Sequence, residues 1–151
     1  MNEKIENISA RALIVVLVAL VIFFNHIEPI QTHPFIHLLQ KGSLLGAAAA
    51  LFLNIRYGFT SKHYALSLLF ALLGLLLSLF HASYHICPET ISYGDPFLHF
   101  SIYTWWSISF FGVLTSLSLL LCFHKPHKTP FKKAEFFWLV LVILATVYIL
   151  K

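Results

Sequence analysis

Long apolar runs separated by short polar links dominate the sequence. At about 1.5 Å per residue, each run can cross a hydrocarbon core about 30 Å thick, and the last run is near the lower limit. The pattern therefore predicts an all-α membrane protein, a helical bundle that occupies residues 1–151 as a single transmembrane domain. The expected helices cover approximately residues 11–28, 36–56, 64–86, 98–123 and 134–150.

The composition agrees with this prediction. Of the 151 residues, 59% are hydrophobic and only 11% are charged, and the mean hydropathy is +0.83. These values lie far outside those of a soluble domain. The run over 12–27 follows a short polar start, but it lacks a small-x-small cleavage site. We therefore expect a retained helix rather than a signal peptide.

Basic residues lie in links that alternate along the chain. They precede the first run, separate the second run from the third, and separate the fourth from the fifth: Lys4, Arg11, Arg56, Lys62, Lys125, Lys128, Lys132 and Lys133. By the positive-inside rule these links and the N-terminus face the cytoplasm, and the C-terminus is expected on the opposite, periplasmic side. Membrane orientation explains the formal charge of +4, so we expect the lipid bilayer as a partner and no nucleic acid.

Small residues recur every four positions in the second run, at Gly42, Gly46 and Ala50. Such a stripe lets a neighbouring backbone approach closely. We therefore expect this helix to be central to the bundle. The alternative is a stripe that serves a homodimer.

Aromatic residues gather near the start of the fourth run, at Tyr103, Trp105 and Trp106. One interpretation is a belt at the membrane–water interface, where Trp and Tyr are enriched. The other is that they line a site for a flat lipophilic ligand.

Most of the nine histidines map to the expected periplasmic side. His33 and His37 are four residues apart, as are His81 and His85, so each pair shares one face of a helix. These four imidazoles form a candidate site for a divalent metal, or for a haem held by one histidine from each segment. The competing interpretation places them in the headgroup layer, because no carboxylate-rich second shell accompanies them.

The two cysteines are expected at opposite membrane faces. Cys87 follows the third run, and Cys122 ends the fourth. A helix from Leu98 to Cys122 spans about 36 Å, whereas a disulfide needs Cα atoms within about 7 Å. We therefore predict no disulfide between them. Cys122 is expected to be a small buried hydrophobe, and Cys87 is either a reactive thiol or an unreactive residue.

Several stretches between residues 53 and 105 carry a family resemblance. They are Leu53-Asn-Ile-Arg-Tyr-Gly58, Ser61-Lys-His-Tyr-Ala-Leu-Ser-Leu-Leu69, His85-Ile-Cys-Pro88, Tyr93-Gly-Asp-Pro96 and Leu98-His-Phe-Ser-Ile-Tyr-Thr-Trp105. In them the chain resembles the bacterial DsbB-like disulfide bond formation proteins, and the likeness covers most of residues 11–150. The resemblance implies the fold of a family of oxidoreductases. Its members pass electrons from a periplasmic dithiol oxidase to a membrane quinone.

The Cys-x-x-Cys pair of that family is missing here. In the family it lies at the top of helix two, four residues before a basic residue near the quinone. Leu38-Leu-Gln-Lys41 resembles the tail of this motif, so Lys41 falls on the basic position and His37 on the second cysteine. Imidazole can neither attack nor resolve a disulfide. The resemblance therefore implies the fold and a retained quinone site, with thiol catalysis lost or altered.

These observations set our expectations for function. The resemblance makes Lys41, His37 and His85 the candidate quinone contacts, and it makes Cys87 the candidate reactive thiol. Lys41 has two candidate roles, donating to a quinone carbonyl or snorkelling to the interface. The alternatives are a metal- or haem-binding membrane protein and a non-catalytic subunit or scaffold of a membrane assembly.

Overall fold

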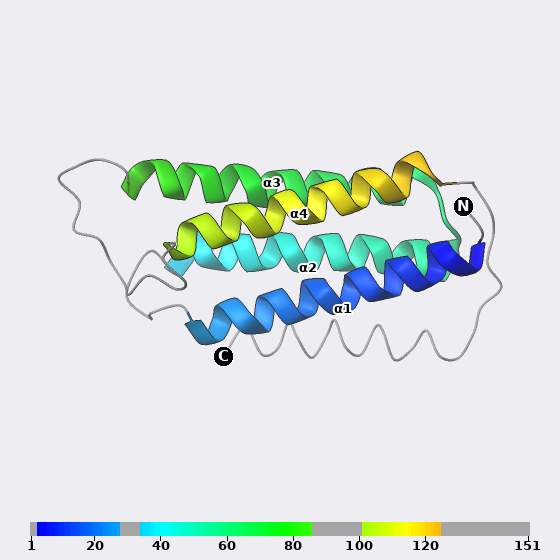
Figure 1. Cartoon of the computed structure of the whole chain (residues 1–151), viewed down its shortest axis with the longest axis horizontal. Coiled ribbons are helices and arrows are strands. Elements are labelled where there is room, and N and C mark those ends of the chain that lie inside the picture. Colours follow the sequence, from blue (N-terminus) through cyan, green and yellow to red (C-terminus); the bar gives the residue numbers. More distant parts are fainter. Residues whose placement is uncertain (1–2, 28–33, 86–100, 125–151) are drawn as a thin grey trace.

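Four helices make up the part of the chain that the computed structural model describes, residues 3–27, 34–85 and 101–124 (Figure 1). They are α1 (Glu3–Ile27), α2 (Pro34–Tyr57), α3 (Ser61–His85) and α4 (Ile102–Cys122). Each is long and apolar enough to cross a membrane. The prediction of an all-α fold with membrane-length helices is confirmed to this extent, and the expected helix over 134–150 lies outside the described residues.

Helices that follow one another in the chain run in opposite directions and pack side by side (Figure 1). α2 packs against α1 and α3, α3 also packs against α4, and α1 meets α4 along a looser seam. In the most apolar part of α2, 50% of the residues are buried, against 28–33% in the other three helices. The central position predicted for this helix is confirmed. We call the end that holds the start of α1 the N-terminal end, and the other the distal end.

The start of α1 differs from the prediction. The helix begins at Glu3 rather than near Arg11, so the short polar start belongs to the helix. The physical reason is burial, since Glu6 and Ala10 lie one turn apart and both are fully buried in the bundle. At the other extreme of the bundle, α4 begins at Ile102, because Ser101 before it has an extended backbone.

A tight turn joins α2 to α3. Gly58 has a φ of 97°, in the left-handed region that favours glycine just after a helix. Asn54 holds the turn, since its Oδ1 accepts a hydrogen bond of 2.9 Å from the backbone N–H of Thr60. Phe59 between them is fully buried. The turn therefore fixes α2 and α3 as antiparallel neighbours.

The stripe of small residues on α2 serves contacts within the chain at Gly46. A Cβ at Gly46 would lie 2.6 Å from the ring of Phe70 on α3, whereas one at Gly42 would meet nothing within 4 Å. Ala50 is buried. Gly46 thus allows the close approach of α3, and the homodimer alternative stays a prediction.

Two of the three aromatic residues at the start of α4 face the interior, and Trp106 is fully buried. Its ring stacks on Phe24 of α1, with centroids 3.8 Å apart. Tyr103 is also buried, because it lies three residues before Trp106 and so shares its face. The interpretation as an interfacial belt is therefore wrong for these two residues, while Trp105 is half-buried.

Candidate functional site

Polar and aromatic side chains from all four helices meet inside the distal end of the bundle. α2 contributes three of them, α3 two, and α1 and α4 one each. We call this group the distal cluster, and its members are Asn25, His37, Gln40, Lys41, Ser78, His81 and Tyr103.

The α2 side of the distal cluster is one helical face. His37, Gln40 and Lys41 are separated by three and four residues, so their side chains lie together, and all three are buried. Lys41 is only 9% exposed, and its Nζ donates a 3.0 Å hydrogen bond to Oδ1 of Asn25 on α1. The structure places this ammonium inside the bundle, which does not fit the snorkelling hypothesis.

The two imidazoles of the distal cluster are packed against each other. The rings of His37 and His81 meet edge to face with centroids 4.9 Å apart, and His81 also meets Tyr103 of α4 at 4.4 Å. His81 is 1% exposed. The headgroup-layer interpretation is therefore wrong for His37 and His81. Ring contacts link α2, α3 and α4 at this point.

Gln40 extends the distal cluster toward α3. Its Nε2 donates a 3.0 Å hydrogen bond to Oγ of Ser78, and that hydroxyl donates to the carbonyl oxygen of Gly74 at 2.8 Å. The other amide atom, Oε1, is buried with no hydrogen-bond partner among the described residues. An unsatisfied buried acceptor costs about 1–3 kcal/mol. Oε1 of Gln40 therefore suits a ligand that donates a hydrogen bond.

The metal hypothesis is only partly addressed by the structure. It brings His37 and His81 together, but His33 and the side chain of His85 lie outside the described residues. Over the described ranges, no group of three or more His, Cys, Asp or Glu residues is arranged to hold a metal ion. A site for a divalent metal or haem therefore depends on ligands beyond those ranges and stays a prediction.

The cysteines contribute nothing to the distal cluster as described. Cys122 is exposed in the last turn of α4, so the expectation of a buried hydrophobe is wrong. At this position the side chain lies on the surface of the described bundle. Cys87 lies outside the described residues, and its proposed reactivity stays a prediction.

A second buried polar group, missed from the sequence, lies at the N-terminal end. Glu6 of α1 is fully buried, and its Oε1 accepts a 3.0 Å hydrogen bond from the hydroxyl of Tyr64 on α3. The same oxygen lies 2.7 Å from Nδ1 of His124, just after α4. We call Glu6, Tyr64 and His124 the N-terminal clasp. No sequence pattern pairs residues so far apart in the chain.

The sequence did hold a signal for the missed members of the distal cluster. Gln40 is one turn after His37, and Ser78 is one turn before His81, so each shares a face with a predicted site residue. Asn25 is a polar residue at the end of an apolar run.

The family resemblance rests on the sequence stretches and on the place of Lys41 and His37 in the second helix. A bundle of membrane-length helices is common to many membrane protein families, so the architecture does not test this resemblance. Comparison of the chain with protein-family models, curated proteins and solved structures finds no match.

Proposed function

We propose that the distal cluster binds the head group of a membrane quinone, in a DsbB-like inner-membrane protein whose thiol catalysis is lost or altered. The observation that carries the proposal is the buried ammonium of Lys41 in a membrane-length bundle, on the same face of α2 as His37, whose buried ring meets that of His81. Charged and ionisable groups at membrane depth are costly, and they mark binding or transfer sites. The distal end faces the periplasm in this proposal.

The donors and acceptors of the distal cluster fit a quinone. Lys41 and His37 carry N–H groups, which suit the carbonyl oxygens of the oxidised ring. Oε1 of Gln40 is an acceptor, which suits a hydroxyl of the reduced ring. A quinone supplies the site with an acceptor for two electrons and two protons. The residues of the chain orient the head group and balance its charge.

Lys41 is held in place by its neighbour on α1. Its hydrogen bond to Asn25 fixes the ammonium on the side of α2 that faces α1. A positive charge positioned in a low-dielectric interior stabilises negative charge that develops on a nearby oxygen. Lys41 is thus the residue of the distal cluster that would stabilise charge on a bound quinone ring, and Asn25 positions it.

The family activity begins with the transfer of electrons from a dithiol oxidase to the membrane protein. This chain lacks the residues for that step in its usual form. A dithiol oxidase hands on its electrons through two sulfurs, one that is attacked and one that resolves the mixed disulfide. The chain has no Cys-x-x-Cys pair, and Cys87 is its remaining candidate reactive thiol. We therefore propose quinone binding as the retained function and thiol transfer as the altered one.

Replacing Lys41 by methionine is expected to weaken quinone binding about tenfold or more, since a hydrogen bond from a charged group contributes about 1.5–3 kcal/mol. Methionine keeps the length of the side chain and removes the charge and the donors. The measurement is the Kd of a short-chain quinone for the purified protein in lipid nanodiscs. The matched control is Lys62→Met, because Lys62 is exposed at the other end of the bundle.

Two results would contradict this proposal. One is a Kd that is the same in the parent and in Lys41→Met, and the other is an equal loss in Lys41→Met and Lys62→Met. Electron entry is tested separately, by mixing the protein with a reduced dithiol oxidase and a soluble quinone. Quinone reduction that survives Cys87→Ser would show that the electrons do not pass through this thiol.

A metal site is the second candidate function, and the contact between the rings of His37 and His81 favours it. Imidazole is the commonest protein ligand of transition metals. Elemental analysis and the visible absorption of the purified protein separate this candidate from the first. A colourless, metal-free protein that keeps its helical fold rules the metal and haem hypotheses out.

A further inference from the structure

The N-terminal clasp contains a carboxylate that is removed from water. Glu6 is fully buried, and the side chain of His124 is 3% exposed. Both Tyr64 and His124 bond to the same carboxylate oxygen. The 2.7 Å separation of Glu6 Oε1 and His124 Nδ1 falls in the range of about 2.7–2.9 Å for a bond between charged groups. The Glu6 carboxyl group thus joins α1 to α3 and to the residue that follows the C-cap of α4.

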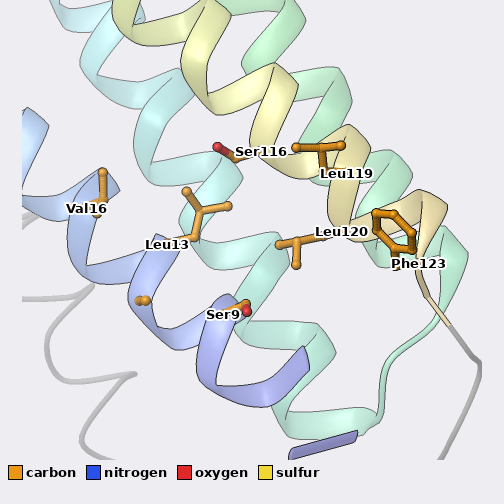
Figure 2. Close-up of a pocket in the computed structure, with 8 residues that line it drawn as sticks. Ser9, Leu13, Val16, Ser116, Leu119, Leu120 and Phe123 are labelled. Carbon is orange, nitrogen blue, oxygen red and sulfur yellow. The ribbon is translucent and has the colours of Figure 1, made fainter. Parts of the chain in front are cut away.

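The clasp lies where α1 and α4 are otherwise poorly joined. Next to it the seam opens into an apolar groove of about 500 Å³ (Figure 2). Its lining includes Ser9, Leu13 and Val16 from α1, Ser116 and Leu120 from α4, and Phe123 just after α4. Ser9 and Leu13 follow Glu6 on the same face, and Phe123 precedes His124. The contact between Glu6 and His124 therefore closes the N-terminal end of this groove.

The clasp is separate from the proposed quinone site. Glu6 and Asn25 lie on the same helix, and at 1.5 Å per residue their separation is about 28 Å. No direct proton exchange between the two sites is possible over that distance. In addition, Nε2 of His124 is buried and has no hydrogen-bond partner within the described chain. The function proposed for the distal cluster therefore does not explain the N-terminal clasp.

We propose that the N-terminal clasp is a proton-binding site that controls the seam between α1 and α4. A proton from water at the N-terminal end binds the Glu6 carboxylate, and the same proton returns to that water when the site resets. Protonation removes the negative charge that holds His124, and a charge-assisted hydrogen bond is about twice as strong as a neutral one. The end of α4 then separates from α1, and the groove opens.

Other ionisable groups lie at the same end of the bundle. His124 and Tyr64 face Glu6 directly. The remaining titratable or charged side chains described there are Lys4, Arg11, Arg56, Tyr57, Lys62, His63 and Cys122. Several of these are exposed, which screens their influence. His63 is half-buried, so it is the competing source of a response to pH and serves as a control.

The test follows the distance between α1 and α4 as the pH is lowered. Spin labels are placed on Cys122, which is exposed at the end of α4, and on Ile8→Cys, which is exposed on α1. Both labels are carried by a Cys87→Ser protein in nanodiscs, and pulsed electron resonance gives the distance distribution. We expect two populations, one at a shorter and one at a longer distance. The ratio of the longer-distance population to the shorter-distance population should rise about tenfold, as the loss of one charge-assisted hydrogen bond predicts.

The variants decide whether Glu6 is the site. Glu6→Gln keeps the shape and the acceptor but cannot bind a proton, so its distances are expected not to change with pH. His63→Gln is expected to respond like the parent. Infrared difference spectra between the two pH values should show a carboxyl band that Glu6→Gln loses. The proposal would be overturned if the distances in the parent did not change with pH. It would also be overturned if the distances in Glu6→Gln still changed with pH. If Glu6→Gln does not fold, His124→Gln replaces it and should lose the response.

Discussion

Replacing Gly74 by alanine is expected to destabilise the bundle by roughly 1–3 kcal/mol, the cost typical of overpacking a core. A Cβ at Gly74 would overlap the ring of Phe110 on α4. That ring cannot easily move away, because Phe110 is fully buried and its ring stacks near Trp106, with centroids 5.8 Å apart. Gly74 therefore sets how closely α3 and α4 approach.

Gly112 is the matched control for this prediction. It also lies inside a helix, but a Cβ there would meet nothing within 4 Å. Gly112→Ala is therefore expected to leave stability unchanged or to raise it by about 0.5–1 kcal/mol, the usual helical preference for alanine over glycine. Unfolding in mixed micelles, followed by circular dichroism, measures both.

A double mutant identifies the clash as the cause. In Gly74→Ala combined with Phe110→Leu, the smaller side chain makes room, so the combined loss should be less than the sum of the two single losses. Equal effects of Gly74→Ala and Gly112→Ala would show that the contact with Phe110 does not limit the packing of α3 against α4.

The four described helices were predictable because the hydrophobic runs are long and the membrane requires each backbone to bond within its own segment. The same reasoning failed at the start of α1. Hydropathy assigns Glu6 to a polar link, whereas the structure buries it. Tyr64 and His124 supply its partners from positions 58 and 118 residues away. Pairing over such distances depends on the packing of α1 against α3 and α4, which no local pattern encodes.

The distal cluster was predictable in part. His37 was a candidate because of the spacing of the histidines, and Lys41 was a candidate because of the family resemblance. The depth at which these two side chains are buried could not be predicted, because a histidine or lysine near the end of an apolar run also suits the headgroup layer. The position of Trp106 was misjudged for the same reason, since sequence alone does not show which face of α4 meets α1. The sequence does not determine how each helix is rotated about its own axis.

Replacing Trp106 by alanine is expected to cost roughly 3 kcal/mol, near the lower end of the range for this change in soluble cores. The lower end applies because lipid is as apolar as the protein interior, so mainly the packing contribution is lost. Trp106 is fully buried, and its stacking on Phe24, at 3.8 Å between ring centroids, joins α4 to α1 at the distal end. The same unfolding measurement in mixed micelles applies.

Phe111→Ala is the control for Trp106→Ala, because Phe111 is a large aromatic residue on the same helix but is 66% exposed. Its removal takes away contacts with lipid rather than with α1, so a change within about 0.5 kcal/mol is expected. Trp106→Ala should also weaken quinone binding, since Tyr103, one turn away, packs on His81. If Trp106→Ala were no more harmful than Phe111→Ala, the stacked pair would not be what closes the distal end of the seam between α1 and α4.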